Sequence, residues 1–194
     1  MDGSTPLPPG QHLVSAPKVR HYGPVPRVGA RPWSMIFSVD QAGGGETLGR
    51  LTVAELAELE GAEVDGDLHC ASGWSAQSLA WSGVPTAVLV DRFPPPPGTV
   101  GVLVYGEYGY SANVRLEDLL RPSSLVATGL DGRPLAPEHG FPVRLVVPHL
   151  YSWKSAKWFR GWEYLTAQRR GFWEERGYHL HGDPWAEERY SYLE

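Results

Sequence analysis

Glycine and proline recur along the whole chain, and they predict many loops and turns between short regular elements. The 194 residues include 23 glycines and 18 prolines, both above average usage. Between them, short apolar segments of strand and helix character follow one another without a regular strand–helix–strand repeat. This mixture favours an α+β fold over a doubly wound parallel sheet. We therefore expect one domain of mixed β-sheets with short helices.

The domain is expected to span residues 18–194, a length that suits a single hydrophobic core. Residues 1–17 are dominated by Pro, Gly and Ser and show no alternation of apolar and polar residues. Such a composition predicts a flexible N-terminal tail. No internal repeat and no second domain are evident in the sequence.

A few local elements bear on the later argument. Residues 33–39 (WSMIFSV) alternate as a strand does. Thr52 followed by Glu55 predicts a capped helix start. Residues 64–70 are expected to form one strand that ends at Cys70, and residues 76–82 a short helix. The triplet at 43–45 (GGG) predicts a turn.

The charge balance and the missing motifs exclude several classes of function. A formal net charge of −5 gives no basic field to attract nucleic acid or anionic lipid. The sequence has neither a GxGxxG nor a Walker A motif. Residues 1–11 lack the charged start and apolar run of a signal peptide, and no stretch approaches 18 apolar residues. A cytoplasmic protein with no membrane span is expected.

Cys70 is the only cysteine in the chain. A lone cysteine is often a small buried apolar residue. Cys70, however, lies at a predicted strand end that enters a Gly/Ser-rich turn, where a thiolate could face a cleft and bind a transition metal. A nucleophilic role would need a base close in space. His69 is a poor candidate for that base, because neighbours on a strand point to opposite faces.

Residues 151–158 (YSWKSAKW) place two lysines and two serines directly after a predicted strand. Such a loop can offer a phosphate its N–H, hydroxyl and ammonium groups, although a solvated basic turn has the same composition. Arg144 lies within the apolar strand predicted at 143–147, and a buried charge needs an anionic partner. A phosphate shared by Arg144 and Lys157 would satisfy both cations.

Two further segments have both a functional and a structural interpretation. The turn at 109–113 (GYSAN) could place the Tyr110 hydroxyl in a cleft or could be a turn only. His179 and His181 would share one face of a strand. Because no further ligands are apparent, ordinary hydrogen bonding is the favoured interpretation of these histidines over a metal site.

Taken in order, five segments resemble the molybdopterin-binding domain of the sulfite-oxidase family. They are residues 19–26 (VRHYGPVP), the turn containing Cys70, Tyr110 with Asn113, residues 139–148 (HGFPVRLVVP) and residues 154–158 (KSAKW). The resemblance runs from about Arg20 to Trp158. The C-terminal sequence GFWEERGYHLHGDPW is similar to a small bacterial branch of the same family.

The resemblance implies roles for the matching residues. Cys70 matches the cysteine whose sulfur binds molybdenum, and Tyr110 matches a tyrosine beside the metal. Arg20 matches an arginine that helps to attract an anionic substrate, which makes Cys70, Tyr110 and Arg20 the expected catalytic residues. The residues expected to bind the cofactor are Arg20, His21, Tyr22, Gly23, Cys70, His139, Arg144, Ser155, Ala156 and Lys157.

The function implied is that of a molybdopterin-dependent oxidoreductase with a molybdenum–molybdopterin cofactor. It would transfer an oxygen atom at a Mo(VI)/Mo(IV) pair to or from a small sulfur or nitrogen oxo substrate, such as sulfite or an S-oxide. Electrons would then pass singly to or from a separate haem or flavin protein. The metal carries this chemistry, and the protein tunes it.

The sequence also departs from the family pattern. Animal and plant sulfite oxidases carry an arginine shortly after the cysteine, and the matching position here is Ser75. The Cys70–Trp74–Ser75 pattern is closer to the catalytic subunit of bacterial methionine-sulfoxide reductases, and Trp74 would suit an apolar substrate group. Sulfite oxidation and S-oxide reduction both remain open. Two other functions also remain open: a cofactor-free binding domain, and a cysteine hydrolase that uses Cys70.

Overall fold

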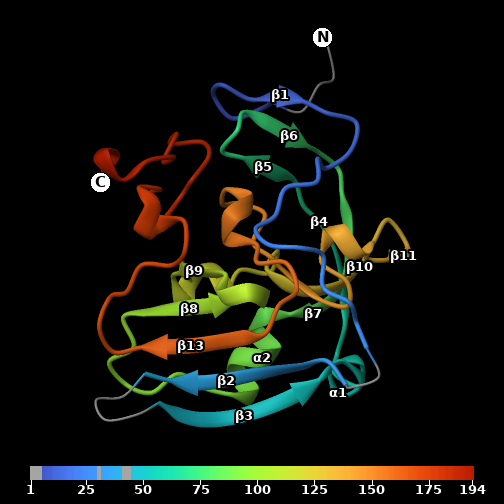
Figure 1. Cartoon of the computed structure of the whole chain (residues 1–194), viewed down its shortest axis with the longest axis vertical. Coiled ribbons are helices and arrows are strands. Elements are labelled where there is room, and N and C mark those ends of the chain that lie inside the picture. Colours follow the sequence, from blue (N-terminus) through green and yellow to red (C-terminus); the bar gives the residue numbers. More distant parts are fainter. Residues whose placement is uncertain (1–5, 30–31, 41–44) are drawn as a thin grey trace.

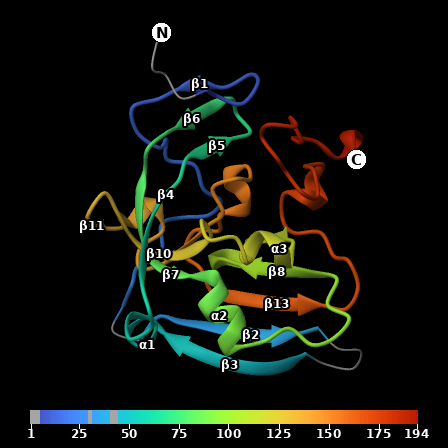
Figure 2. The same ribbon diagram turned by 180° about the vertical axis from the view of Figure 1, so that it is seen from behind.

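Two five-stranded sheets and one three-stranded sheet make up the computed structural model, which describes residues 6–29, 32–40 and 45–194. Figures 1 and 2 show the first five-stranded sheet at the bottom of the molecule and the three-stranded sheet near the top. The mixed sheets and short helices confirm the α+β fold predicted from the sequence.

The first five-stranded sheet has the order β3-β2-β13-β8-β9. Its strands are β2 (Ser34–Val39), β3 (Glu46–Thr52), β8 (Gly101–Tyr105), β9 (Ser111–Val114) and β13 (Gly161–Leu165). Strand β13 is parallel to β2 and antiparallel to β8. Every second residue of β2, from Met35 to Val39, is buried in the main core, as the alternating sequence predicts.

The second five-stranded sheet has the order β11-β10-β7-β4, and β12 also pairs with β10. Its strands are β4 (Ala62–Asp65), β7 (Ala80–Pro85), β10 (Leu125–Leu130), β11 (Arg133–Pro134) and β12 (Arg144–Val146). The three-stranded sheet, β1-β6-β5, comprises β1 (His12–Leu13), β5 (Leu68–Cys70) and β6 (Trp74–Ala76). Cys70 is therefore the last residue of a strand.

All helices are short. They are α1 (Val53–Ala57), α2 (Thr86–Arg92) and α3 (Leu116–Leu119), with 3₁₀ turns η1 (Glu107–Gly109), η2 (Pro137–His139), η3 (Ser152–Lys154), η4 (Glu174–Arg176) and η5 (Ser191–Leu193). The predicted cap at Thr52 is confirmed. Its side chain accepts a hydrogen bond from the Glu55 backbone N–H, and the Glu55 carboxylate accepts one from the Thr52 N–H.

The sequence assigned two neighbouring elements incorrectly. The strand expected at 64–70 is divided, because Gly66 and Asp67 separate β4 from β5 and the two strands belong to different sheets. The helix expected at 76–82 is absent, and this stretch instead contains the end of β6 and the start of β7. Strand β7 pairs with β4 and β10 and buries Trp81 completely. Pairing on both edges outweighs a weak local helix preference.

The N-terminal segment lies against the cysteine turn in the part that the structure describes. Strand β1 is parallel to β6, with His12 opposite Trp74, and the Gln11 side-chain amide donates to the Cys70 carbonyl oxygen at 3.1 Å. Backbone pairing of this kind needs no apolar pattern, so sequence composition does not reveal it. Residues 1–5 of the expected tail and Gly43 and Gly44 of the expected turn lie outside the described residues.

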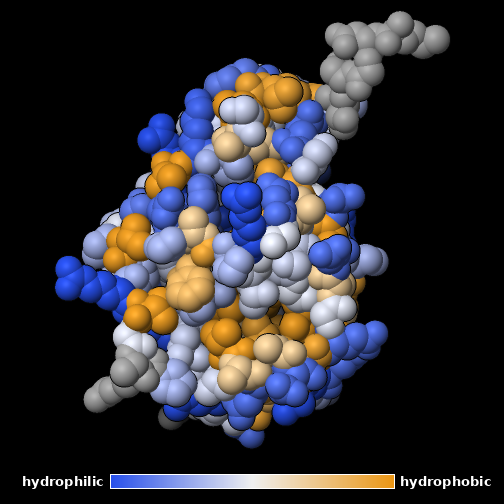
Figure 3. Space-filling model, turned by 90° about the vertical axis from the view of Figure 1, so that its right-hand side faces the viewer, coloured by the Kyte–Doolittle hydropathy of each residue, from blue (hydrophilic) through white to orange (hydrophobic). Residues whose placement is uncertain are grey.

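Among the described residues, no helix is both long and apolar enough to cross a membrane. On the face drawn in Figure 3, apolar residues gather in a patch in the lower part and again near the top, and hydrophilic residues lie between and around them.

Candidate functional site

A cavity of about 320 Å³ lies where the end of β5, the η3 region, the chain before β2 and the C-terminal segment meet. Its lining includes most of the residues expected to act in catalysis or cofactor binding. Those residues are Arg20, His21, Tyr22, Cys70, Tyr110, His139, Arg144, Ser155 and Lys157. Segments far apart in the sequence thus contribute to one site, and the roles of these residues remain predictions.

The Cys70 side chain is partly exposed and lines this cavity. Its sulfur lies 3.2 Å from the Ser72 hydroxyl. The neighbouring His69 is buried, and its ring is hydrogen-bonded to the Ser75 hydroxyl at 2.8 Å. No histidine ring hydrogen-bonds to the Cys70 sulfur in the described part of the chain, so this arrangement gives no support to a cysteine–histidine hydrolase.

Arg144, the first residue of β12, is only 2% exposed. Its guanidinium donates to the carbonyl oxygens of His139 and Ser155, both at 3.2 Å. Burial lowers the pKa of Arg144 to about 10. Within the described residues Arg144 forms no ion pair, so its charge is buried without a carboxylate.

Lys157 is the second cation that lines the cavity. Its ammonium donates to the Glu138 carbonyl oxygen at 2.7 Å, and it too has no ion pair among the described residues. Burial lowers the pKa of Lys157 to about 7, and the charge of Arg144 acts in the same direction. An anion beside the buried Arg144 and the half-buried Lys157 would stabilise the charged form of both.

The backbone around these cations is crowded. Gly140 has a φ of +113°, and a Cβ there would lie 2.9 Å from the Arg144 Cβ and 3.4 Å from the Lys157 Cα. The Ser155 hydroxyl accepts a hydrogen bond from the Val147 N–H at 3.0 Å. Burial lowers the pKa of His139, with Lys157 and Arg144 acting in the same direction. An anionic group such as a phosphate would fit this cluster of cations.

The Tyr110 hydroxyl donates to the Trp153 carbonyl oxygen. Burial raises the pKa of Tyr110 well above its usual value, and the charge of Glu174 acts in the same direction. The phenol therefore stays protonated. The hydroxyl proton is used in this hydrogen bond within the protein, and the sequence alone could not indicate that.

The segment before β2 supplies an exposed rim to the cavity. Arg20 is exposed and makes no hydrogen bond or ion pair among the described residues. The His21 ring lies edge-on to Trp158, with centroids 5.1 Å apart, and the Tyr22 ring lies 4.4 Å from that of Phe172.

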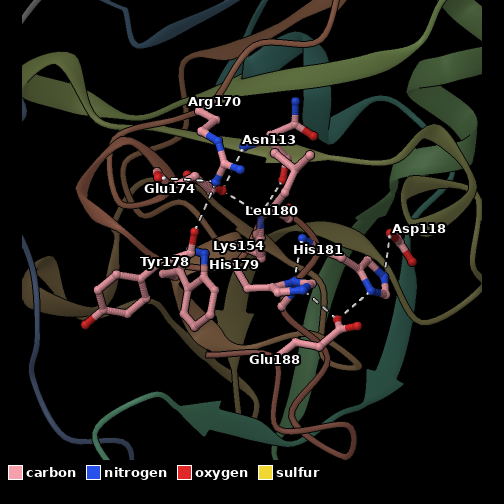
Figure 4. Close-up of polar contacts among 12 residues, drawn as sticks. Asn113, Asp118, Lys154, Arg170, Glu174, Tyr178, His179, Leu180, His181 and Glu188 are labelled. Atoms are coloured by element: carbon pink, nitrogen blue, oxygen red, sulfur yellow. Dashed lines mark hydrogen bonds and ion pairs between the residues drawn. The ribbon is translucent and has the colours of Figure 1, made fainter. Parts of the chain in front are cut away.

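Two residues expected to bind the cofactor, Gly23 and Ala156, do not line the cavity, and neither does Lys154 of the predicted phosphate loop. Gly23 has a φ of +73° and lies against the Tyr108 ring. Ala156 is buried in the main core. Lys154 is completely buried, and its ammonium donates to Glu174 and to the carbonyl oxygens of Asn113 and Leu180 (Figure 4). A fully paired lysine is not available to a phosphate, so only Lys157 of the two loop lysines can serve.

The sequence analysis missed most of the aromatic lining. Trp153, Trp158, Trp173 and Tyr178 all line the cavity, and Lys18 joins Arg20 at its rim. The sequence indicated an aromatic lining only through its composition, because the chain has 8 tryptophans. Which of them face a cavity depends on long-range packing.

The histidines of the His179–His181 pair belong to a hydrogen-bonded cluster (Figure 4) and do not line the cavity. His181 contacts Glu188 at 2.9 Å and Asp118 at 3.5 Å, and His149 contacts Asp118 at 2.8 Å. No group of three or more potential ligands in the described residues is arranged to hold a metal. The cluster instead connects the C-terminal segment to α3.

One cavity thus brings together a partly exposed thiol, a buried and a half-buried cation without carboxylate partners, and an aromatic lining. The sequence profile of the family described as "Oxidoreductase molybdopterin binding domain" matches residues 22–173. The chain therefore belongs to this family of molybdopterin-binding oxidoreductases of the sulfite-oxidase type.

Similar proteins agree with this assignment. The chain is 36% identical to the uncharacterized oxidoreductase YuiH of Bacillus subtilis over 98% of this chain and 95% of that protein. It is 34% identical to the protein-methionine-sulfoxide reductase catalytic subunit MsrP of Xanthomonas campestris, over 65% of this chain but only 42% of that protein. The sulfane dehydrogenase SoxCD of Paracoccus pantotrophus shares the fold, with a TM-score of 0.65 at 17% identity, over 76% of this chain and 42% of that chain.

Proposed function

We propose that the cavity binds a molybdenum–molybdopterin cofactor and that the protein is an oxygen-atom-transferring oxidoreductase. The observation that carries this proposal is that the buried Arg144 and the half-buried Lys157, two cations without carboxylate partners, share a cavity with Cys70. The family assignment supports the same cofactor.

Each group has a task that suits its chemistry. The Cys70 thiolate is a soft ligand appropriate for molybdenum. Arg144 and Lys157 would hold the cofactor phosphate, and Ser155 and His139 would lie beside it. When bound, the cofactor supplies the Mo(VI)/Mo(IV) pair that exchanges an oxygen atom and two electrons with the substrate. Tyr110 keeps its proton and fixes the Trp153 backbone in the cavity wall.

We further propose that the substrate is an organic S-oxide that the enzyme reduces. The MsrP relative is a methionine-sulfoxide reductase by name. Ser75 occupies the position at which sulfite oxidases carry an arginine. It is buried, forms hydrogen bonds with the side chains of His69 and Gln11, and does not line the cavity. Trp74 lines the cavity and offers an apolar surface.

Sulfite oxidation is the second candidate, and one observation favours it. Lys18 and Arg20 at the cavity rim are exposed cations without ion pairs in the described part of the chain, so they could attract an anion. With either substrate, the two electrons would be exchanged singly with a separate haem or flavin protein. The name of the MsrP relative, a catalytic subunit, supports a separate partner. The cytoplasm stays the predicted compartment.

The test is the molybdenum content of protein purified from a host that makes the cofactor. We expect about one molybdenum per chain, with loss of the metal in the Cys70→Ser variant and of metal and pterin together in Lys157→Gln. Arg133→Gln, an exposed arginine on β11, is the matched charge control and should keep both. Folded parent protein without molybdenum would overturn the proposal. Loaded protein would then be assayed with sulfite and with S-oxides.

A further inference from the structure

Trp173 and Tyr178 form one wall of the cavity that Cys70 lines. The match to the family domain ends at residue 173. Tyr178 therefore belongs to a C-terminal segment that the family domain does not define, yet its side chain contributes to the site.

Tyr178 is held firmly in place. Its ring lies edge-on to Trp153 with centroids 4.9 Å apart, 5.3 Å from Trp173 and 5.7 Å from Tyr190. Its backbone N–H donates to the Trp173 carbonyl oxygen at 3.1 Å, and it forms an isolated β-bridge with Tyr190. Gly177 makes the preceding turn with a φ of +93°, a conformation that glycine adopts without strain. The ring is thus a fixed surface.

The wall that Tyr178 belongs to carries no available charge. Lys154 lies behind Trp153, but its ammonium is fully buried and paired with Glu174. The other cations around the cavity come from residues 18–20 and 144–157. Tyr178 makes no side-chain hydrogen bond within the described residues. An apolar aromatic face with one spare hydroxyl is therefore offered to whatever lies beside it.

Cys70 lines the same cavity as this wall and the cations. Burial raises the pKa of Tyr178, with Tyr190 and Cys70 acting in the same direction. For Lys157, burial and Arg144 lower the pKa, whereas Glu138 and Cys70 oppose that shift. The thiol is therefore near enough to affect both residues. A cofactor whose phosphate lies at Lys157 and whose metal is at Cys70 would leave the Tyr178 wall to the substrate.

We propose that Tyr178 is a specificity-determining residue whose ring contacts the apolar substituent of an organic S-oxide. This inference rests on the proposed function and deepens it. An aromatic wall selects substrates by apolar contact, and loss of one such contact changes relative turnover by about tenfold or more. We therefore expect preference for an S-oxide with a large apolar group over a small one.

The test compares methyl p-tolyl sulfoxide with dimethyl sulfoxide as substrates of the molybdenum-loaded enzyme, with a reduced dye as electron donor. The variants are Tyr178→Leu, which removes the aromatic ring, and Tyr178→Phe, which removes only the hydroxyl. Tyr192→Leu is the matched control, because Tyr192 is 78% exposed and does not line the cavity. Molybdenum content should be the same in all four proteins.

For Tyr178→Leu we expect the ratio of kcat/KM for the two sulfoxides to fall by about tenfold, mainly through KM for the aryl substrate. Tyr178→Phe and Tyr192→Leu should keep the parental ratio. A second readout is the Kd of methyl p-tolyl sulfide for dithionite-reduced enzyme, measured by calorimetry. This Kd should increase by a similar factor in Tyr178→Leu and stay unchanged in the other two variants.

Three results would overturn the inference. If the parent reduces sulfoxides but the ratio and the Kd are unchanged in Tyr178→Leu, the wall does not select substrates, and the proposed function stands. If the kcat/KM ratio falls as much in Tyr178→Phe as in Tyr178→Leu, the hydroxyl and not the ring is responsible for the substrate preference. If the loaded parent neither reduces sulfoxides nor binds the sulfide, the proposed S-oxide function falls as well.

Discussion

Lys154 and Glu174 form an ion pair in which both side chains are completely buried, and this pair joins η3 to the C-terminal segment. The same ammonium donates to the carbonyl oxygens of Asn113 and Leu180 at 2.6 Å. Breaking a buried pair leaves the remaining charge without a partner, which is a large cost. The pair therefore ties the Trp173–Tyr178 wall to the rest of the cavity.

Replacing Lys154 with Met should lower the free energy of unfolding by about 3–5 kcal/mol, because the Glu174 carboxylate would stay buried without a cation and keep only the hydrogen bond from the Asn113 N–H. Urea denaturation measures this loss. Arg115→Met is the matched control, since the Arg115–Glu117 pair is exposed and such pairs contribute about 0–1 kcal/mol. Equal losses of unfolding free energy in the two variants would show that the buried Lys154–Glu174 pair stabilises the fold no more than an exposed pair does.

The pKa of Lys157 makes anion binding depend on pH. Because that pKa is about 7, Lys157 is a cation below pH 7 and is neutral above it. Sulfate is a suitable probe, since it does not titrate near neutrality. We expect its Kd for cofactor-free protein to rise by up to about tenfold between pH 7 and pH 8. In Lys157→Gln the sulfate Kd should be higher than that of the parent at pH 6 and nearly independent of pH. A parental Kd that is equally independent of pH would contradict the prediction.

Gly140 tests whether the crowded backbone positions the two cations. In Gly140→Ala a Cβ would meet the Arg144 Cβ at 2.9 Å, so Arg144 must shift. Gly132→Ala is the matched control, because Gly132 also has a positive φ (+70°) but has nothing within 4 Å of its Cβ position. Both variants should lose about 1–2 kcal/mol of stability from backbone strain. Only Gly140→Ala should also lose molybdenum, and equal metal contents in the two would argue against a positioning role.

The cation site was predictable from the sequence because its residues conflict with their local surroundings. Arg144 within an apolar strand and Lys157 in a short basic loop each indicated a missing anion, and the structure places both at the cavity of Cys70. Lys154 gave the same local signal. Its partner Glu174 is 20 residues away, and a pairing of that kind depends on how the C-terminal segment folds back.

The aromatic wall and strand β7 could not be predicted from the sequence either, because both depend on contacts between distant residues. Trp81 lies in a stretch predicted as a helix, but its strand pairs with both β4 and β10, and Trp81 lies opposite Val64 and Leu130, which are distant in the sequence. Tyr178 lies in a segment without periodicity, where 3₁₀ turns and side-chain pairs replace regular structure. Local patterns report local propensity and cannot specify contacts of this kind.

The Asp118–His181 contact makes the attachment of the C-terminal segment depend on pH. The contact with the Asp118 carboxylate is the main cause that raises the pKa of His181 above its usual 6.5. The protonated histidine therefore stabilises the fold below pH 6.5, and this contribution is lost as the pH rises through the raised pKa. In Asp118→Asn that contribution should disappear, so the free energy of unfolding should fall less between pH 6 and pH 8 than it does in the parent.

Urea denaturation at several pH values measures this difference, which should be about 1 kcal/mol. His181→Gln is the companion variant, because it removes the titrating ring while leaving Asp118 its contact with His149. It should show the same flattened dependence on pH. Parallel pH curves for the parent and both variants would mean that His181 titrates alike in the folded and unfolded chains. The Asp118 contact would then hold the C-terminal segment by geometry alone.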